Sequence, residues 1–164
     1  MRVVDEIEDI NDLIIELKAK LSKDKNNKDL LIRESFVLWY ALVEGVKCEN
    51  FTETELNELL VQNYNQYKKF FLNDVDYDFI IGWMLSVAFW YFNDLNDNDG
   101  RKILMNVYKR KSENFLFKWA VRGDLNLNKD EISHLCKSIG SDFYKFYNYG
   151  PFIKRYFLDL IKVR

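Results

Sequence analysis

Proline and glycine are scarce in this chain, whose 164 residues contain one Pro, Pro151, and six Gly. A β-sandwich or β-barrel needs turn-forming residues at short, regular intervals. Long stretches without such residues are typical of helices instead. The scarcity therefore argues against an all-β fold and favours an all-α one.

Cysteine and histidine are also too few to build most metal or catalytic centres. Cys48 and Cys136 lie far apart in the chain and form no CxxC pair. Two free thiols are the simpler interpretation, and a disulfide between them stays open. His134, the only histidine, follows Glu131 at the spacing found in di-iron bundles, but such a site needs two of these motifs. We therefore expect no metal and no cofactor.

No sequence motif indicates an enzyme. The chain lacks a Walker loop, GxGxxG, HExxH and GxSxG. Asp130 and His134 stand four residues apart, so they share a helix face, and the carboxylate would orient the imidazole of a general base. An ordinary surface pair is the simpler interpretation, because no nucleophile is signalled nearby. We expect a protein that is not an enzyme.

Long hydrophobic runs are absent as well. The longest, Phe79 to Phe92, spans fourteen residues, whereas a transmembrane helix needs about 20. The acidic N-terminus, MRVVDEIEDINDL, has no apolar segment of the kind found in a secretory signal. The run is expected to be a helix buried in a protein core, in a cytoplasmic protein that does not enter a membrane.

The residues that are abundant suit a packed domain. Hydrophobic residues make up 48% of the chain and aromatic residues 16%, and 24 basic residues nearly balance 26 acidic ones. Such a composition does not resemble that of a disordered chain, and the length fits one domain. We predict a single helical domain over residues 1–164.

Hydrophobic spacing and capping signals divide this domain into helices. Apolar residues from Val3 to Leu21 recur at intervals of three and four, which indicates an amphipathic helix. Thr52 with Glu55, and Asn128 with Glu131, are spaced as capping boxes, and Pro151 suits a first helical turn. The expected helices are 3–21, 29–46, 52–72, 77–93, 100–110, 112–122, 128–139 and 151–163. The fold class is all-α: an antiparallel helical bundle or a short α-solenoid-like array of about seven to eight helices.

One stretch has the spacing of a tetratricopeptide-like helix hairpin. The small residues Ala88 and Gly100 stand twelve apart, and Leu104 and Val107 follow before a new helix begins at Ser112. No second copy is present, so an ordinary helical hairpin is the simpler interpretation.

Charge is unevenly distributed along the chain. Residues 1–100 carry 10 basic and 20 acidic residues, and residues 101–164 carry 14 basic and 6 acidic ones. If the third and fourth helices are antiparallel, the acids near 49–58 and 94–99 lie at one end of the domain, where they would attract a basic partner. The alternative is that these acids cap helices and face solvent. A pI near 5.5 argues against direct nucleic-acid binding.

Aromatic residues crowd the segment 141–152, SDFYKFYNYGPF, which holds six of them. Six rings are too many for one side of a short helix, so some tyrosines should reach the surface and suit an interface. The alternative is that they cover one end of the bundle.

Two segments resemble a known group of proteins. They are the Asp-rich entry into an apolar helix, Asp74–Phe92 (DVDYDFIIGWMLSVAFWYF), and Glu113–Arg122 (ENFLFKWAVR). Together with the Asn-, Lys-, Ile- and Tyr-rich composition, they make residues 70–160 resemble the small immunity proteins of bacterial toxin–immunity systems, such as contact-dependent growth inhibition.

The resemblance implies a function without catalysis. Such a protein stays in the cytoplasm, binds the C-terminal domain of a cognate toxin, often a nuclease such as an RNase, and occludes its basic active-site cleft. We expect it to be a monomer when free. The alternative is a helical adaptor or regulator that binds a peptide or protein. From charge and aromatic content, the residues expected at the interface are Glu49, Glu53, Asp94, Asp97, Asp99, Tyr144 and Tyr147.

Overall fold

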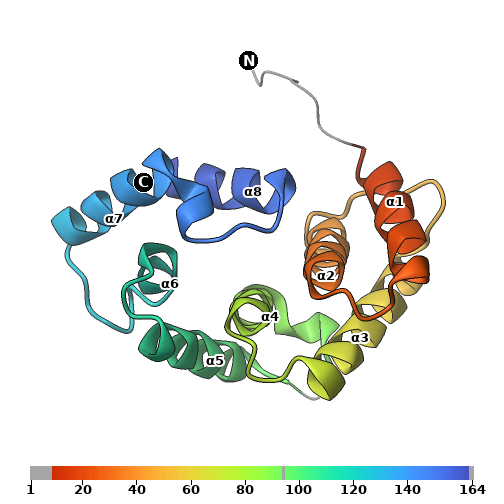
Figure 1. Ribbon diagram of the computed structural model, residues 1–164, viewed down its shortest axis with the longest axis horizontal. Coiled ribbons are helices and arrows are strands. Elements are labelled where there is room, and N and C mark those ends of the chain that lie inside the picture. The colour runs from red at the N-terminus through yellow and green to blue at the C-terminus, as the bar shows by residue number, and fades with distance from the viewer. Residues whose placement is uncertain (1–8, 94, 163–164) are drawn as a thin grey trace. The chain divides into compact units, whose positions relative to one another are not determined.

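The structure is a computed structural model that describes residues 9–93 and 95–162. Within these residues the chain forms eight α-helices and two 3-10 helices and no strand, which confirms the all-α prediction. Contacts between residues divide the chain into two compact units, residues 1–71 and 72–164. Figure 1 shows the helices of both units. The predicted single domain stays a prediction.

The first unit contains three helices. They are α1 (Ile10–Lys23), α2 (Lys28–Val43) and α3 (Glu53–Phe70). The middle helix, α2, packs against both of the others and is buried along most of its length. Of the apolar stripe predicted for the first helix, Ile10, Ile14 and Leu17 are buried, and Val3 and Ile7 lie outside the described residues.

Asn side chains join the start of α1 to the connection between α2 and α3. The Asn11 amide donates to Asn50 Oδ1 at 2.9 Å, and the Asn50 backbone N–H donates to Asn11 Oδ1 at 3.0 Å. This paired bond fixes the entry into α3, whose N-terminus carries the capping box predicted from Thr52 and Glu55. Hydrogen bonds from Thr52 stabilise the Glu55 carboxylate and lower its pKa.

The second unit contains the remaining elements. They are α4 (Val75–Ala88), η1 (Phe89–Tyr91), α5 (Asp97–Arg110), α6 (Phe115–Ala120), α7 (Lys129–Ser141), η2 (Phe143–Lys145) and α8 (Pro151–Lys162). Each α-helix packs against the next one in the chain. The last helix, α8, also packs against α4. The ring centroid of Phe157 in α8 lies 5.6 Å from that of Phe79 and 5.2 Å from that of Trp83, both in α4. The helices of this unit therefore close into a bundle.

Aromatic side chains form the core of this bundle. Phe79 contacts Phe117 of α6 at 4.7 Å, and Trp83 stacks on Trp119 at 5.6 Å. Burying one large apolar side chain is worth roughly 1.5–3 kcal/mol. Because α4 contributes to contacts on nearly every side, it is the central helix, as the apolar run predicted. Among the described residues, no helix is both long and apolar enough to cross a membrane.

Glycine sets the distance between α4 and α5. A Cβ atom at Gly100 would lie 2.4 Å from the backbone N of Ser86 and 2.8 Å from the carbonyl oxygen of Gly82. These are backbone atoms, which cannot move aside as a side chain can. On the facing helix, a Cβ at Gly82 would lie 3.0 Å from Leu104. The hairpin predicted around Ala88 and Gly100 thus exists, and its close packing requires glycine.

We expect Gly100→Ala to destabilise the second unit by about 3 kcal/mol, because the added methyl group forces α5 away from α4. Chemical denaturation measures the loss. The control is Gly140→Ala on α7, where a Cβ meets no atom within 4 Å and alanine should stabilise the helix by up to about 1 kcal/mol. Equal stability of the two variants would contradict the close approach.

A buried carboxyl group lies in the core of the first unit. Glu34 on α2 is 3% exposed, and the Asn63 amide donates to its Oε2 at 2.8 Å. Burial raises the pKa of Glu34, opposed by the hydrogen bond from Asn63 and the charge of Lys18. The folded state therefore binds the proton more readily than the unfolded state, and stability falls as pH rises through the folded pKa.

We expect Glu34→Gln to stabilise the first unit near neutral pH, since the amide keeps an acceptor for Asn63 and removes the buried charge. As pH rises above the ordinary carboxyl range, the stability of the wild-type protein should fall, and the stability of the variant should not. Denaturation at several pH values tests this, with the exposed Glu58→Gln as control. A variant less stable than wild type at neutral pH would contradict a destabilising effect of the buried Glu34 charge.

Candidate functional site

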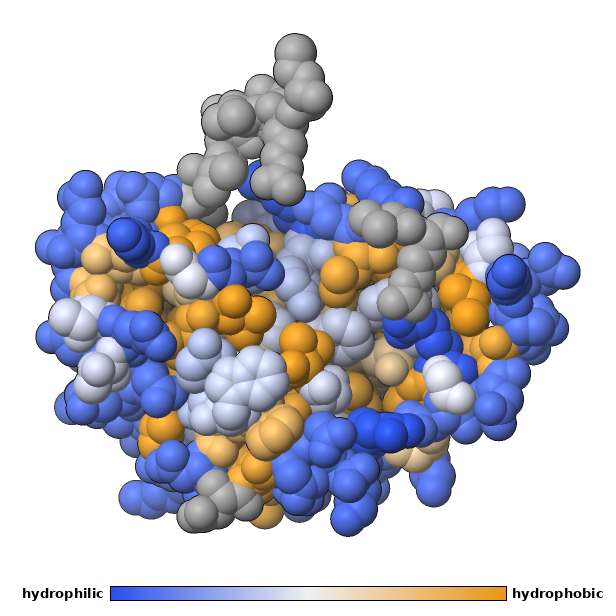
Figure 2. All heavy atoms as spheres, turned by 180° about the vertical axis from the view of Figure 1, so that it is seen from behind, coloured by the Kyte–Doolittle hydropathy of each residue, from blue (hydrophilic) through white to orange (hydrophobic). Residues whose placement is uncertain are grey.

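Large apolar side chains are exposed in both units. Figure 2 shows apolar residues reaching the surface between hydrophilic ones. The large hydrophobic residues that are exposed among those described are Ile15, Phe70, Leu72, Val87, Trp90 and Tyr144. Two of them stand close together in the chain: Val87 is in the last turn of α4, and Trp90 is in η1, which follows it.

Trp90 is far more exposed to solvent than the other three tryptophans. Trp39, Trp83 and Trp119 are 1%, 8% and 1% exposed, whereas Trp90 is 62% exposed. The Trp90 ring lies between those of Phe89 and Tyr91, at 5.6 and 5.9 Å between centroids. We call Val87, Phe89, Trp90 and Tyr91 the Trp90 patch. Tryptophan is among the residues that most often dominate binding energy at protein interfaces.

The Trp90 patch lies at the end of α4, which comes earlier in the chain than predicted. The helix predicted over 77–93 stops at Ala88, and the next three residues form the 3-10 helix η1. The Phe92 backbone N–H donates to Phe89 O at 2.8 Å, which closes this tighter turn. The change of helix type leaves Phe92 buried at 2% and Trp90 in solvent.

Acidic residues lie beside the patch. The first turn of α5 carries Asp97, which is exposed, and Asp99, which is half-buried. The contact of Gly100 with Ser86 places this turn against the last turn of α4, directly before Val87. Trp90, an exposed ring that is not among the predicted interface residues, therefore stands in η1, just before the helix that carries Asp97 and Asp99.

No protein-family model, curated protein or solved structure matches the chain.

The remaining predicted interface residues occupy different settings. Glu49 and Glu53 are exposed in the first unit, at the entry to α3. Asp94 lies outside the described residues. Tyr144 is 40% exposed, with the Lys154 ammonium 4.4 Å from its ring centroid. The gathering of these acids at one end of the domain stays a prediction.

Tyr147 is a core residue. It is 2% exposed, and its hydroxyl donates to the backbone oxygen of Asp76 at 2.8 Å. Burial, with the charge of Asp76 next, raises the pKa of Tyr147 well above its ordinary value. In this structure Tyr147 joins the segment before α8 to the start of α4 and presents almost no surface to a partner.

Several acids before and within α4 serve the fold. Asp74 caps the helix by accepting from Tyr77 N at 3.1 Å, and Asp76 accepts from the Tyr149 hydroxyl at 2.7 Å. Asp78, which is buried, pairs with Arg110 of α5. Of these three acids, Asp74 is a helix cap, whereas Asp76 and Asp78 bond to side chains of other elements. Charge counts alone therefore overstate the acid available to a partner.

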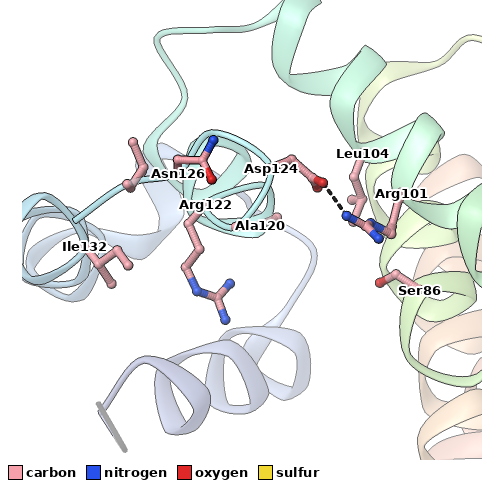
Figure 3. A pocket seen from close by; sticks show the side chains of 10 residues that line it. Ser86, Arg101, Leu104, Ala120, Arg122, Asp124, Asn126 and Ile132 are labelled. Carbon is pink, nitrogen blue, oxygen red and sulfur yellow. Dashed lines mark hydrogen bonds and ion pairs between the residues drawn. The ribbon is translucent and has the colours of Figure 1, made fainter. Parts of the chain in front are cut away.

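A separate groove lies in the second unit and has a volume of about 720 Å³. Its walls come from α4, α5, the end of α6, the connection between α6 and α7, and α7 (Figure 3). The apolar residues that line the groove are Leu104, Ala120, Leu127 and Ile132. The polar ones are Ser86, Arg101, Arg122, Asp124 and Asn126.

The residues considered for catalysis or metal binding include His134 and its neighbours on α7. His134 is exposed and lines a shallow hollow with Asp130 and Glu131. The Glu131 carboxylate accepts from the Asn128 backbone N–H at 2.8 Å, in the capping box that the sequence predicted. Across the described residues, no three His, Cys, Asp or Glu side chains gather as metal ligands. The Cys48 and Cys136 thiols are both free.

Proposed function

We propose that this protein is an immunity protein that binds a cognate bacterial toxin domain in the cytoplasm of the producing cell and blocks its active site. The toxin is a nuclease, an RNase in the first instance, with a basic cleft. The observation that carries the proposal is the exposed Trp90 patch, which is followed in the chain by Asp97 and Asp99 in the first turn of α5. An exposed aromatic anchor next to carboxylates suits a surface that is both apolar and cationic.

The two parts of this surface have different tasks. The Trp90 ring supplies apolar area that loses water on binding and slows dissociation. Asp97 attracts lysine and arginine side chains that a nuclease uses to hold a polyanion, and thereby speeds association. The Asp99 carboxylate already accepts from the Asn96 backbone N–H at 3.0 Å, so it contributes its charge rather than a free side chain. Glu49 and Glu53, which are exposed in the first unit, are part of the same proposal as residues that a basic partner would contact.

The partner to test is the C-terminal domain of a large secreted protein encoded immediately upstream. Co-expression with that domain should restore growth that the domain alone prevents. A complex formed with a peptide or another protein, without protection from any toxin, would instead favour the helical adaptor. Protection that disappears in His134→Ala would contradict a purely binding mechanism.

We expect Trp90→Ala to weaken toxin binding by at least about 30-fold, the effect of losing an interface anchor worth about 2 kcal/mol. Titration calorimetry measures the change. Leu72→Ala is the matched control, because Leu72 is 60% exposed and lies before α4, at the opposite end of that helix from Trp90. Equal losses in the two variants, or none in Trp90→Ala, would remove Trp90 from the interface.

We expect Asp97→Asn to slow association several-fold at low salt and to leave dissociation nearly unchanged, because an exposed charge acts mainly on encounter. Stopped-flow measurements over a range of salt concentrations provide the test, with the exposed Asp159→Asn on α8 as control. An association rate for the wild-type protein that is the same at high and low salt would show that steering plays no part.

A further inference from the structure

Among the described residues, three large aromatic rings are exposed to solvent, and lysine side chains lie over two of them. The Lys69 ammonium lies 5.0 Å from the ring centroid of Phe70, and the Lys154 ammonium lies 4.4 Å from that of Tyr144. A cation within about 6 Å of a ring centroid is attracted by the negative charge on the ring face. The protein therefore supplies a cation of its own to each of these two rings.

Trp90 is the third exposed ring and has no such cation. At 62% exposed it is more open to solvent than either of the other two rings. Within the part of the chain that the structure describes, no lysine or arginine lies over its indole. Residues 70–100 contain neither residue type, so none close in the sequence reaches this ring. The indole face that best attracts a cation is thus left uncovered.

The two rings next to Trp90 do not close off its faces. The planes of Phe89 and Tyr91 are inclined to the indole by 76° and 46°. A ring stacked between two parallel neighbours would expose only its edges. Because neither neighbour is parallel and most of the indole is in solvent, a flat group can lie on it.

The core of the second unit already contains a contact between an arginine and an indole. The Arg122 guanidinium lies 4.2 Å from the ring centroid of Trp119. Tryptophan binds cations better than the other aromatic residues do, and the planar, weakly hydrated guanidinium stacks on a ring more readily than the ammonium of lysine. Trp90 offers the same type of ring to a group from outside the protein.

The charge that follows Trp90 in the chain also favours a cation. Asp97 is exposed and stands one turn before Gly100, whose contact with Ser86 places the first turn of α5 against the last turn of α4. Arg101, the nearest cation in the sequence, is paired with Asp124. The carboxylate of Asp97 therefore attracts a positive group towards this end of α4 and repels a negative one.

We infer that Trp90 receives an arginine side chain of the protein partner, whose guanidinium lies flat on the indole. The charge of Asp97 adds attraction at longer range. This inference deepens the proposed function, because it names the residue type that the toxin presents to the Trp90 patch, and it rests on that function for the identity of the partner. The contact between the ring and a guanidinium can be tested without the toxin.

The first test places a fluorotryptophan at position 90 of the full-length protein and titrates it with acetyl-arginine amide at constant ionic strength. Fluorine NMR should show a saturable shift, with a dissociation constant on the order of 100 mM, because one exposed contact of this kind is weak. Acetyl-citrulline amide has nearly the same shape without the charge and should shift the signal far less. Equal shifts with both probes, or none with the arginine probe, would overturn the inference.

A matched control uses a ring that the protein already covers. A fluorotyrosine in place of Tyr144, which lies under the Lys154 ammonium, should shift less with acetyl-arginine amide than the reporter at position 90 does. An equal response at the two positions would show that the probe associates with any exposed ring, and would contradict a site at Trp90.

The second test measures binding of the toxin domain by proteins that carry tryptophan with increasing numbers of fluorine atoms at position 90. Fluorine withdraws electrons from the ring face and keeps the ring apolar, so affinity should fall stepwise, by about two- to fivefold over the series. If Trp90→Ala weakens binding and fluorination does not, the arginine contact is overturned and the proposed function stands. Binding of the arginine probe at Trp90 without binding of the toxin domain would support the cation contact and contradict the proposed partner.

Discussion

The close contact between α4 and α5 at Gly100 is the constraint on which the second unit depends. The Cα atom of Gly100 approaches the α4 backbone so closely that a side chain would overlap it. Because the contact falls at the start of α5, it places the first turn of that helix, with Asp97 and Asp99, against the end of α4. The same contact brings Arg101 into the groove that Ser86 also lines. One backbone contact thus positions residues of the proposed interface and of the groove.

Local signals in the sequence predicted the helices well where a side chain bonds to its own backbone. The capping boxes at Thr52 and Asn128 are present as predicted, and Pro151 begins the last helix. Such signals are readable because their partners stand three residues apart. The fifth helix begins at Asp97 rather than at 100, because Asn96 and Asp99 form a third capping box within what was predicted to be a turn. The sixth begins after Asn114, which accepts from Phe117 N at 3.1 Å, rather than at Ser112.

The candidate site was harder to predict, because it depends on contacts between residues far apart in the chain. The apolar run around Trp83 and Trp90 does not show which ring is buried. Trp83 is enclosed because Trp119 and Phe157 pack on it and because its indole donates to the Tyr156 hydroxyl at 3.1 Å. Similarly, the bond of Tyr147 to the Asp76 backbone spans 71 positions, and no local pattern indicates it. Aromatic content therefore predicted that rings would reach the surface, but not which ones.

The first two turns of α5 carry residues of opposite charge. Asp97 lies beside the Trp90 patch, and Arg101, one turn later, lines the groove. Asp97 stabilises the charged form of Arg101 after the larger effect of Asp124, and both raise the pKa of Arg101. Because Asp97 and Arg101 are exposed, water and salt screen their interaction. The pairing with Arg101 therefore leaves most of the charge of Asp97 available at the proposed interface.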